Sequence, residues 1–151
     1  HMRDLAKFMF GVSVFWAYLW FSQFMLIWYA NIPEEVVYFV ARIQDYSLPF
    51  WGMIVTNLIF PFLVLMNSDY KRVNWLIVMT GIVILFGHYL DFYNMIMPGT
   101  VGDQWFIGVP EIGGILFFGG LFIYVVFKEL EKAPLLAKGD PFIKESKNFH
   151  Y

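Results

Sequence analysis

Long apolar stretches without a charged residue constrain this chain more than any other feature. Phe8 to Pro33 contains 26 consecutive residues with no Asp, Glu, Lys or Arg. Tyr46 to Ser68 contains 23 residues and Val73 to Leu90 contains 18, and neither stretch has a charged residue. A helix needs about 20 apolar residues to cross the hydrocarbon core of a bilayer. Each of these stretches therefore predicts a transmembrane helix.

A fourth, shorter stretch runs from Ile112 to Phe127, over 16 residues. It becomes long enough to span if the helix begins at Pro110, a favourable first-turn residue, and continues toward Lys132. Glu111 would then lie in the first turn, where the helix dipole favours a carboxylate. The chain is 60% hydrophobic and 15% charged, whereas soluble domains average about 45–50% and about 25%. The sequence thus predicts an all-α, four-helix membrane region over residues 1–132 and a tail over 133–151.

The basic residues indicate the orientation of these helices. Lys and Arg are enriched in cytoplasmic loops of membrane proteins. With four spans, one side of the membrane holds nine of the ten basic residues and the other holds only Arg42. We therefore predict cytoplasmic termini, with Glu34–Asp45 and Asn94–Val109 as loops on the outer side. The nine residues are Arg3, Lys7, Lys71, Arg72, Lys128, Lys132, Lys138, Lys144 and Lys147.

The composition excludes several function classes. The chain has no cysteine, so it holds no disulfide, cysteine-ligated iron–sulfur cluster or thiol nucleophile. Of His1, His88 and His150, only His88 lies in a predicted span. A haem with two histidine ligands therefore cannot be bound by this chain alone, and we predict no metal site. The net charge of −2 argues against a nucleic-acid partner.

Two polar residues near the end of the third span suggest proton chemistry. His88 and Asp91 are three residues apart and so share a helix face. His88 lies 16 residues after Arg72, about 24 Å along a helix, which places it near the outer surface. An imidazole beside a carboxylate can accept a proton, as quinol oxidation requires. The same pair would also serve as a simple interfacial hydrogen bond, and both interpretations stay open.

Further polar residues extend this pattern. Most lie at the outer ends of helices, whereas Asn57 is the only strongly polar residue near the membrane midplane. Polar groups within a bilayer are costly and are functional candidates, although solvated helix ends and interhelical hydrogen bonds explain them equally well. We predict a proton path that includes Gln23, Asn31, Glu34, Glu35, Asn57 and Glu111.

Several segments combine aromatic residues with polar residues at fixed positions. They are Phe15–Gln23, Leu26–Glu35, His88–Asp91 with Met97–Gly99, Gly108–Gly113 and Lys132–Phe142. In these segments the chain resembles the polysulfide-reductase-like (NrfD-like) membrane subunits of bacterial alternative complex III. The second of these, often called quinone-binding subunit 2, is the closer match. Family members are much longer, and the chain resembles their C-terminal part.

The resemblance implies a role in a quinol:cytochrome c oxidoreductase of the bacterial inner membrane. The chain would be a non-autonomous subunit without a complete active site. It would contribute a proton route or the surroundings of a quinone or menaquinone, and it would bind no cofactor covalently. Haem c and iron–sulfur clusters would belong to partner subunits. The implied partners are a second polysulfide-reductase-like subunit, an iron–sulfur subunit, c-haem subunits and a terminal oxidase.

Two other functions remain compatible with the sequence. The first is a structural membrane subunit that positions its redox partners and has no site of its own. The second is a small transporter, which the lack of a charged midplane residue and of a broken helix disfavours.

Overall fold

The computed structural model describes residues 1–103, 106–135, 139 and 141–148. No strand occurs among these residues, which confirms the prediction of an all-α protein. The chain divides into two compact units, His1–Trp105 and Phe106–Tyr151. The elements are α1 (Met2–Ala30), α2 (Pro33–Gln44), α3 (Ser47–Ile54), η1 (Val55–Ile59), α4 (Phe60–Met66), η2 (Tyr70–Arg72), α5 (Asn74–Thr100), α6 (Val109–Leu130) and α7 (Ile143–Asn148).

Four helical stretches are long and apolar enough to cross a membrane, as predicted. They are Met2–Ala30, Ser47–Met66, Asn74–Thr100 and Val109–Leu130. The second combines α3, η1 and α4 into one continuous helix with a π-helical segment at its centre. The chain is therefore a membrane protein with four helices of spanning length.

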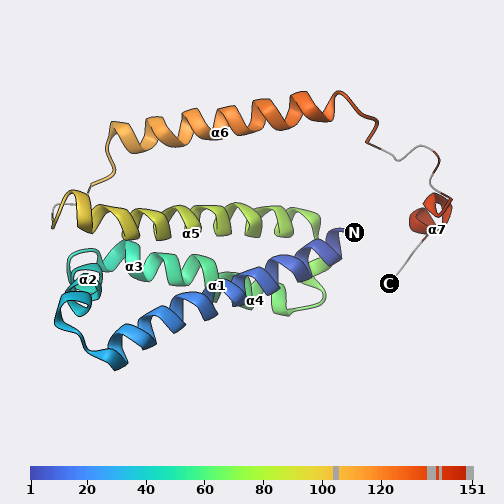
Figure 1. Ribbon diagram of the computed structural model, residues 1–151. Helices are drawn as coiled ribbons and strands as arrows, with labels where there is room; N and C mark the ends of the chain where they lie inside the picture. The colour runs from blue at the N-terminus through green and yellow to red at the C-terminus, as the bar shows by residue number, and fades with distance from the viewer. Residues whose placement is uncertain (104–105, 136–138, 140, 149–151) are drawn as a thin grey trace. The chain divides into compact units, whose positions relative to one another are not determined.

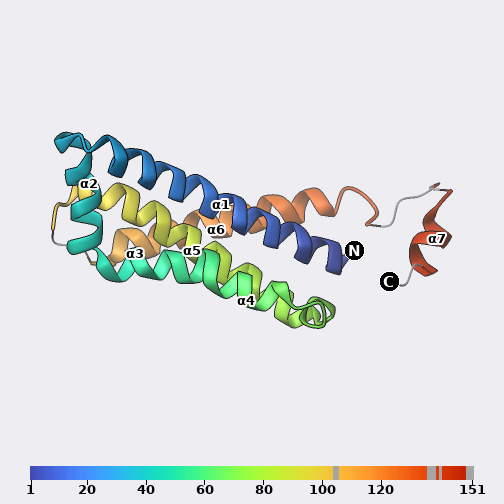
Figure 2. The same ribbon diagram turned by 90° about the horizontal axis from the view of Figure 1, so that it is seen from below.

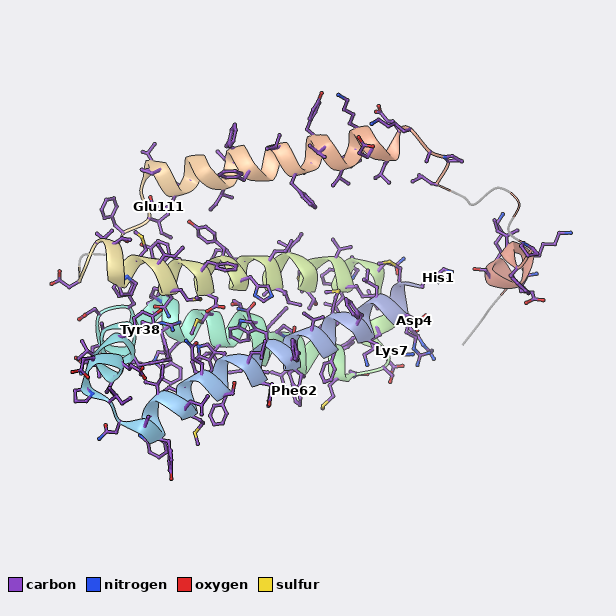
Figure 3. The ribbon with its side chains drawn as sticks, in the orientation of Figure 1. His1, Asp4, Lys7, Tyr38, Phe62 and Glu111 are labelled. Atoms are coloured by element: carbon purple, nitrogen blue, oxygen red, sulfur yellow. The ribbon has the colours of Figure 1, made fainter. Side chains whose placement is uncertain are left out.

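The helix ends differ from the predicted ones. The first helix begins at Met2 rather than Phe8, and its first turns carry the exposed Asp4–Lys7 ion pair of 3.3 Å (Figure 3). The third continues to Thr100, well past Leu90, because a helix tolerates an occasional polar residue or proline where the backbone remains satisfied. The predicted loop Glu34–Asp45 is largely helix α2, which begins at Pro33.

In the first unit, α1, the α3–α4 helix and α5 pack side by side, and α2 crosses one end of them (Figures 1 and 2). Asn31 makes the turn into α2 possible, because its left-handed backbone (φ 50°) ends α1. Tyr46, fully buried between α2 and α3, donates a hydrogen bond to the Gly102 carbonyl just beyond α5. The connection that follows α2 is thus tied to the end of α5.

This unit differs from a soluble bundle because it exposes large apolar side chains and buries several polar ones. The side chains of Ser13, Asn57 and Thr80 lie inside with at most 3% exposure, whereas Phe8 and Leu85 are about 70% exposed. Large exposed apolar side chains are expected where lipid replaces water as the solvent. The interior of the unit therefore holds polar groups.

Toward the end of the unit opposite α2, an apolar cluster fills the interior. Ala6, Leu65 and Ile77 form a buried cluster, with Met9 and Phe10 packed against it. The ring of Phe10 also lies 5.7 Å from the Phe62 ring, which is labelled in Figure 3. This cluster, which we call the apolar plug, fixes the contact of α1 with α4 and α5.

The second unit contains α6 and the described part of the tail. None of the residues of α6 is buried. As predicted, Glu111 lies in the first turn, and its carboxylate accepts a hydrogen bond of 2.8 Å from the Gly108 N–H. The tail forms the short helix α7. Lys138, which is predicted to lie on the cytoplasmic side, is outside the described residues.

Candidate functional site

Arg42 brings a positive charge into the interior of the first unit. It lies on the inner face of α2 and is 1% exposed. The rings of Tyr38, Phe39 and Phe50 surround its guanidinium at 5.2 to 5.9 Å, distances typical of cation–π contacts. Burial lowers the pKa of Arg42 from its ordinary value, an effect that Tyr38 and Asp91 oppose. An arginine remains charged even so, and it therefore needs a negative partner.

Asp91 on α5 is that partner. Its Oδ1 lies 3.9 Å from Nη2 of Arg42, and its Oδ2 accepts a hydrogen bond of 2.9 Å from the Trp16 indole. The carboxylate is 14% exposed. The distance of 3.9 Å is too long for a direct hydrogen bond, so the two groups form an ion pair without one. The charge pair thus joins α2 to α5, and the hydrogen bond from Trp16 joins α1 to the same carboxylate.

His88 lies next to this group but contacts a different part of it. The centroids of the His88 and Trp16 rings lie 6.2 Å apart, and the two rings form a T-shaped contact. Among the described residues, the polar contacts of the Asp91 side chain go to Trp16 and Arg42 rather than to His88. The two residues predicted as a pair therefore share Trp16 as a neighbour, and their proton-handling role stays a prediction.

A cavity of about 190 Å³ adjoins the charge pair. Its aromatic wall is built by Trp16 and Trp20, whose rings stack at 6.3 Å, and the row continues to Phe24 at 6.0 Å from Trp20. We call it the Arg42–Asp91 pocket. It is lined by Trp16, Leu19, Trp20, Gln23, Arg42, Asp91 and Met95.

Two hydrogen-bond donors of this pocket are unused. Nε of Arg42 and Nε1 of Trp20 are buried and have no acceptor among the described residues. Buried donors normally find a partner. The pocket is therefore lined by one carboxylate and an aromatic wall, and two of its lining residues, Arg42 and Trp20, each carry a buried N–H group without an acceptor among the described residues. These groups match the chemistry of a planar ligand with oxygen acceptors and hydroxyl donors.

The other predicted site residues fall in several places. Gln23 lines the Arg42–Asp91 pocket. Asn31 caps α1 and lines a separate apolar groove between α1 and α2, and Glu34 and Glu35 are exposed in the first turn of α2. Interaction with the helix dipole accounts for the position of both glutamates.

Asn57 and Glu111 are placed apart from the pocket. Asn57 is 1% exposed in the π segment, and neither its amide nitrogen nor its amide oxygen has a partner among the described residues. Glu111 belongs to the second unit and bonds the start of its own helix. Of the predicted residues, the structure brings together Asp91, Gln23 and, through Trp16, His88.

Sequence patterns did not point to the two residues that complete the site. Arg42 lies in a segment predicted as a loop, although it is the one basic residue on the predicted outer side and is flanked by apolar residues. Trp16 is one of six tryptophans, and nothing in its local sequence marks it as a partner of a residue 75 positions away.

Among the described residues, no group of three His, Asp or Glu side chains could hold a metal ion.

Comparison with known proteins adds no family. No family model matches the chain, and no curated protein is significantly similar to it. The arrangement of Arg42, Asp91 and the two tryptophans is therefore the main basis for a functional argument.

Proposed function

We propose that this chain is a membrane subunit of a quinol-oxidising respiratory complex, and that the Arg42–Asp91 pocket receives the quinol head group or its protons. The resemblance to alternative complex III suggests the class of complex. The observation that carries the proposal is that Arg42, Trp20 and Asp91 line the same aromatic-walled cavity. Nε of Arg42 and Nε1 of Trp20 have no acceptor among the described residues, and Asp91 supplies a carboxylate.

The chemistry of a quinol matches these groups. Oxidation converts the two hydroxyls into carbonyls and releases two protons and two electrons. A hydroxyl donates to a carboxylate, and the resulting carbonyl accepts from N–H donors. In this proposal Asp91 accepts one proton, and the second leaves to water near the exposed side chain of Gln23. The electrons pass to an iron–sulfur centre of a partner subunit.

The wider proton path belongs to the same proposal. His88 is proposed to pass on the proton that Asp91 accepts, and Asn31, Glu34, Glu35 and Glu111 are proposed to carry protons toward the outer surface. The inner-membrane location, with both termini cytoplasmic, is part of this proposal and is supported by the distribution of basic residues. The partner subunits that the resemblance implies are likewise proposed.

The test replaces Asp91 with Asn in the assembled complex. This variant keeps the size of the side chain and removes the base. We expect quinol-dependent turnover and proton release, measured per assembled complex, to fall by about 10²-fold, as for loss of a general base. Asp69→Asn, an exposed carboxylate between α4 and η2, is the control and should leave turnover unchanged. Normal turnover of an assembled Asp91→Asn complex would refute the proposed role.

A structural membrane subunit is the second candidate, and α6 favours it. Within its own unit, this 22-residue apolar helix has no buried residue. Its glycine pairs, Gly113–Gly114 and Gly119–Gly120, permit close approach of another helix. In this case the only effect of Asp91→Asn would be on assembly or thermal stability, and turnover per assembled complex would equal that of the wild type.

A further inference from the structure

A second polar group lies deeper in the first unit, at Asn57. This residue occupies the π segment of the second span, and π segments often occur at functional positions. Its side chain is 1% exposed, and both polar atoms of the amide lack a protein partner among the described residues. An amide buried in this way is strongly unfavourable unless something small completes its hydrogen bonds.

The neighbouring helix cannot supply those bonds. A Cβ at Gly87 would lie 2.4 Å from Oδ1 of Asn57 and 2.5 Å from the Thr56 hydroxyl. The amide is therefore pressed against the backbone of α5, whose own N–H and C=O groups are engaged within the helix. The Thr56 hydroxyl already donates to the Gly52 carbonyl at 2.8 Å.

Ser13 on α1 lies at a similar depth. Met9 packs toward Gly81, and Trp16 contacts His88, so α1 and α5 run in parallel with an offset of about 72 residues. This register places Ser13 level with the turn of α5 that contains Gly87. The Ser13 hydroxyl is also buried, at 3% exposure, and has no partner among the described residues.

We propose that Asn57 and Ser13 bind internal water in the middle of the first unit. Both side chains are enclosed by the chain's own atoms, so neither a lipid nor a helix of another subunit reaches them. A buried water makes about three hydrogen bonds, and the amide nitrogen, amide oxygen and hydroxyl offer that number. The apolar plug bounds this site on one side. Asp91, one helical turn beyond Gly87, lies on the other.

This proposal does not depend on quinol chemistry. It rests on burial and unpaired polar atoms alone, so it stands or falls separately from the proposed function. If both hold, the water lies next to the turn of α5 that carries Asp91 and can accept the proton that Asp91 takes from the quinol.

X-ray radiolytic labelling of the full chain in its native membranes tests the proposal, because hydroxyl radicals from bound water oxidise adjacent buried side chains. Met53 is fully buried and one turn before Asn57. We expect Met53 to be oxidised, and the buried Leu65 of the apolar plug to stay unmodified. We expect Asn57→Leu to reduce Met53 oxidation several-fold and Ser13→Ala to reduce it less.

Thr80→Val is the matched control. Thr80 is equally buried, but its hydroxyl already donates to the Leu76 carbonyl at 2.7 Å, so Met53 oxidation should not change. Unchanged oxidation in Asn57→Leu would overturn the proposal, because the label would then come from the Arg42–Asp91 pocket. If Asn57→Leu does not fold, the wild-type chain still decides: an unmodified Met53 beside a modified, exposed Met66 would equally overturn the proposal.

Discussion

Arg42 shows how one residue can organise the interior of a membrane unit. A buried guanidinium needs both a counter-charge and hydrogen-bond acceptors. It obtains the charge from Asp91 on another helix and a diffuse attraction from three aromatic rings. Its Nη2 also approaches the sulfur of Met53 at 4.0 Å. The resulting environment is polar enough to hold the charge, although Nε has no acceptor among the described residues.

We expect Arg42 and Asp91 to be energetically coupled. Arg42→Gln and Asp91→Asn should each destabilise the assembled protein by about 3 kcal/mol, because each leaves a buried charge without its partner. The double variant should cost less than the sum, with a coupling energy of about 1–3 kcal/mol. Thermal unfolding of the wild type, the two single variants and the double variant measures this coupling. Additive costs would show that the pair does not interact.

At the scale of elements, the second span packs closely against α5 because α5 has a glycine, Gly87, at the point of contact. At Gly87 an added Cβ meets Asn57 and Thr56 far inside normal contact distance, whereas at Gly81 it would meet only the end of Met9 at 3.5 Å. The two glycines lie six residues apart on α5, so they form a natural pair for comparison.

We expect Gly87→Ala to destabilise the protein by about 1–3 kcal/mol, the usual cost of overpacking a close contact. Gly81→Ala should be neutral or slightly stabilising, because alanine is the better helix former. Melting temperatures of the two variants in the same lipid nanodiscs compare them directly. Equal melting temperatures would contradict the close packing of Asn57 against α5.

The turn between α1 and α2 offers a second comparison. Asn31 adopts a left-handed backbone that costs most other residues about 1–2 kcal/mol and costs glycine almost nothing. We expect Asn31→Ala to lower stability and Asn31→Gly to preserve it, as measured by thermal unfolding. If Asn31 also passes protons, Asn31→Gly should fold normally yet lower turnover, and this result would separate the predicted role from the structural one.

For the whole molecule, the orientation is open to direct test because the chain has no native cysteine. We expect a single cysteine at Glu34 to react with a membrane-impermeant maleimide in right-side-out vesicles. A cysteine at Lys147 should react only in inverted vesicles, because nine of ten basic residues mark the cytoplasmic side. Both positions are exposed and described. Labelling of position 147 from outside would refute the topology.

The spans were predictable from the sequence because the length of an apolar run is a local property. The site was only partly predictable. Asp91 and Gln23 could be selected as polar residues in apolar surroundings, whereas the contribution of Arg42 depends on α2 folding across the bundle. The Trp16–Asp91 hydrogen bond depends on the register of two helices far apart in sequence. Such register is set by packing, and no single segment encodes it.

The separation of Arg42 and Asp91 along the chain has a consequence for biogenesis. Arg42 leaves the ribosome 49 residues before its counter-charge, an interval of roughly 2–10 s at ordinary rates of synthesis. During that time α2 cannot take its final place without burying an unpaired charge. Insertion of α5 should therefore be the step that draws α2 against the bundle, and the Arg42–Asp91 pocket forms only when the third span has entered the membrane.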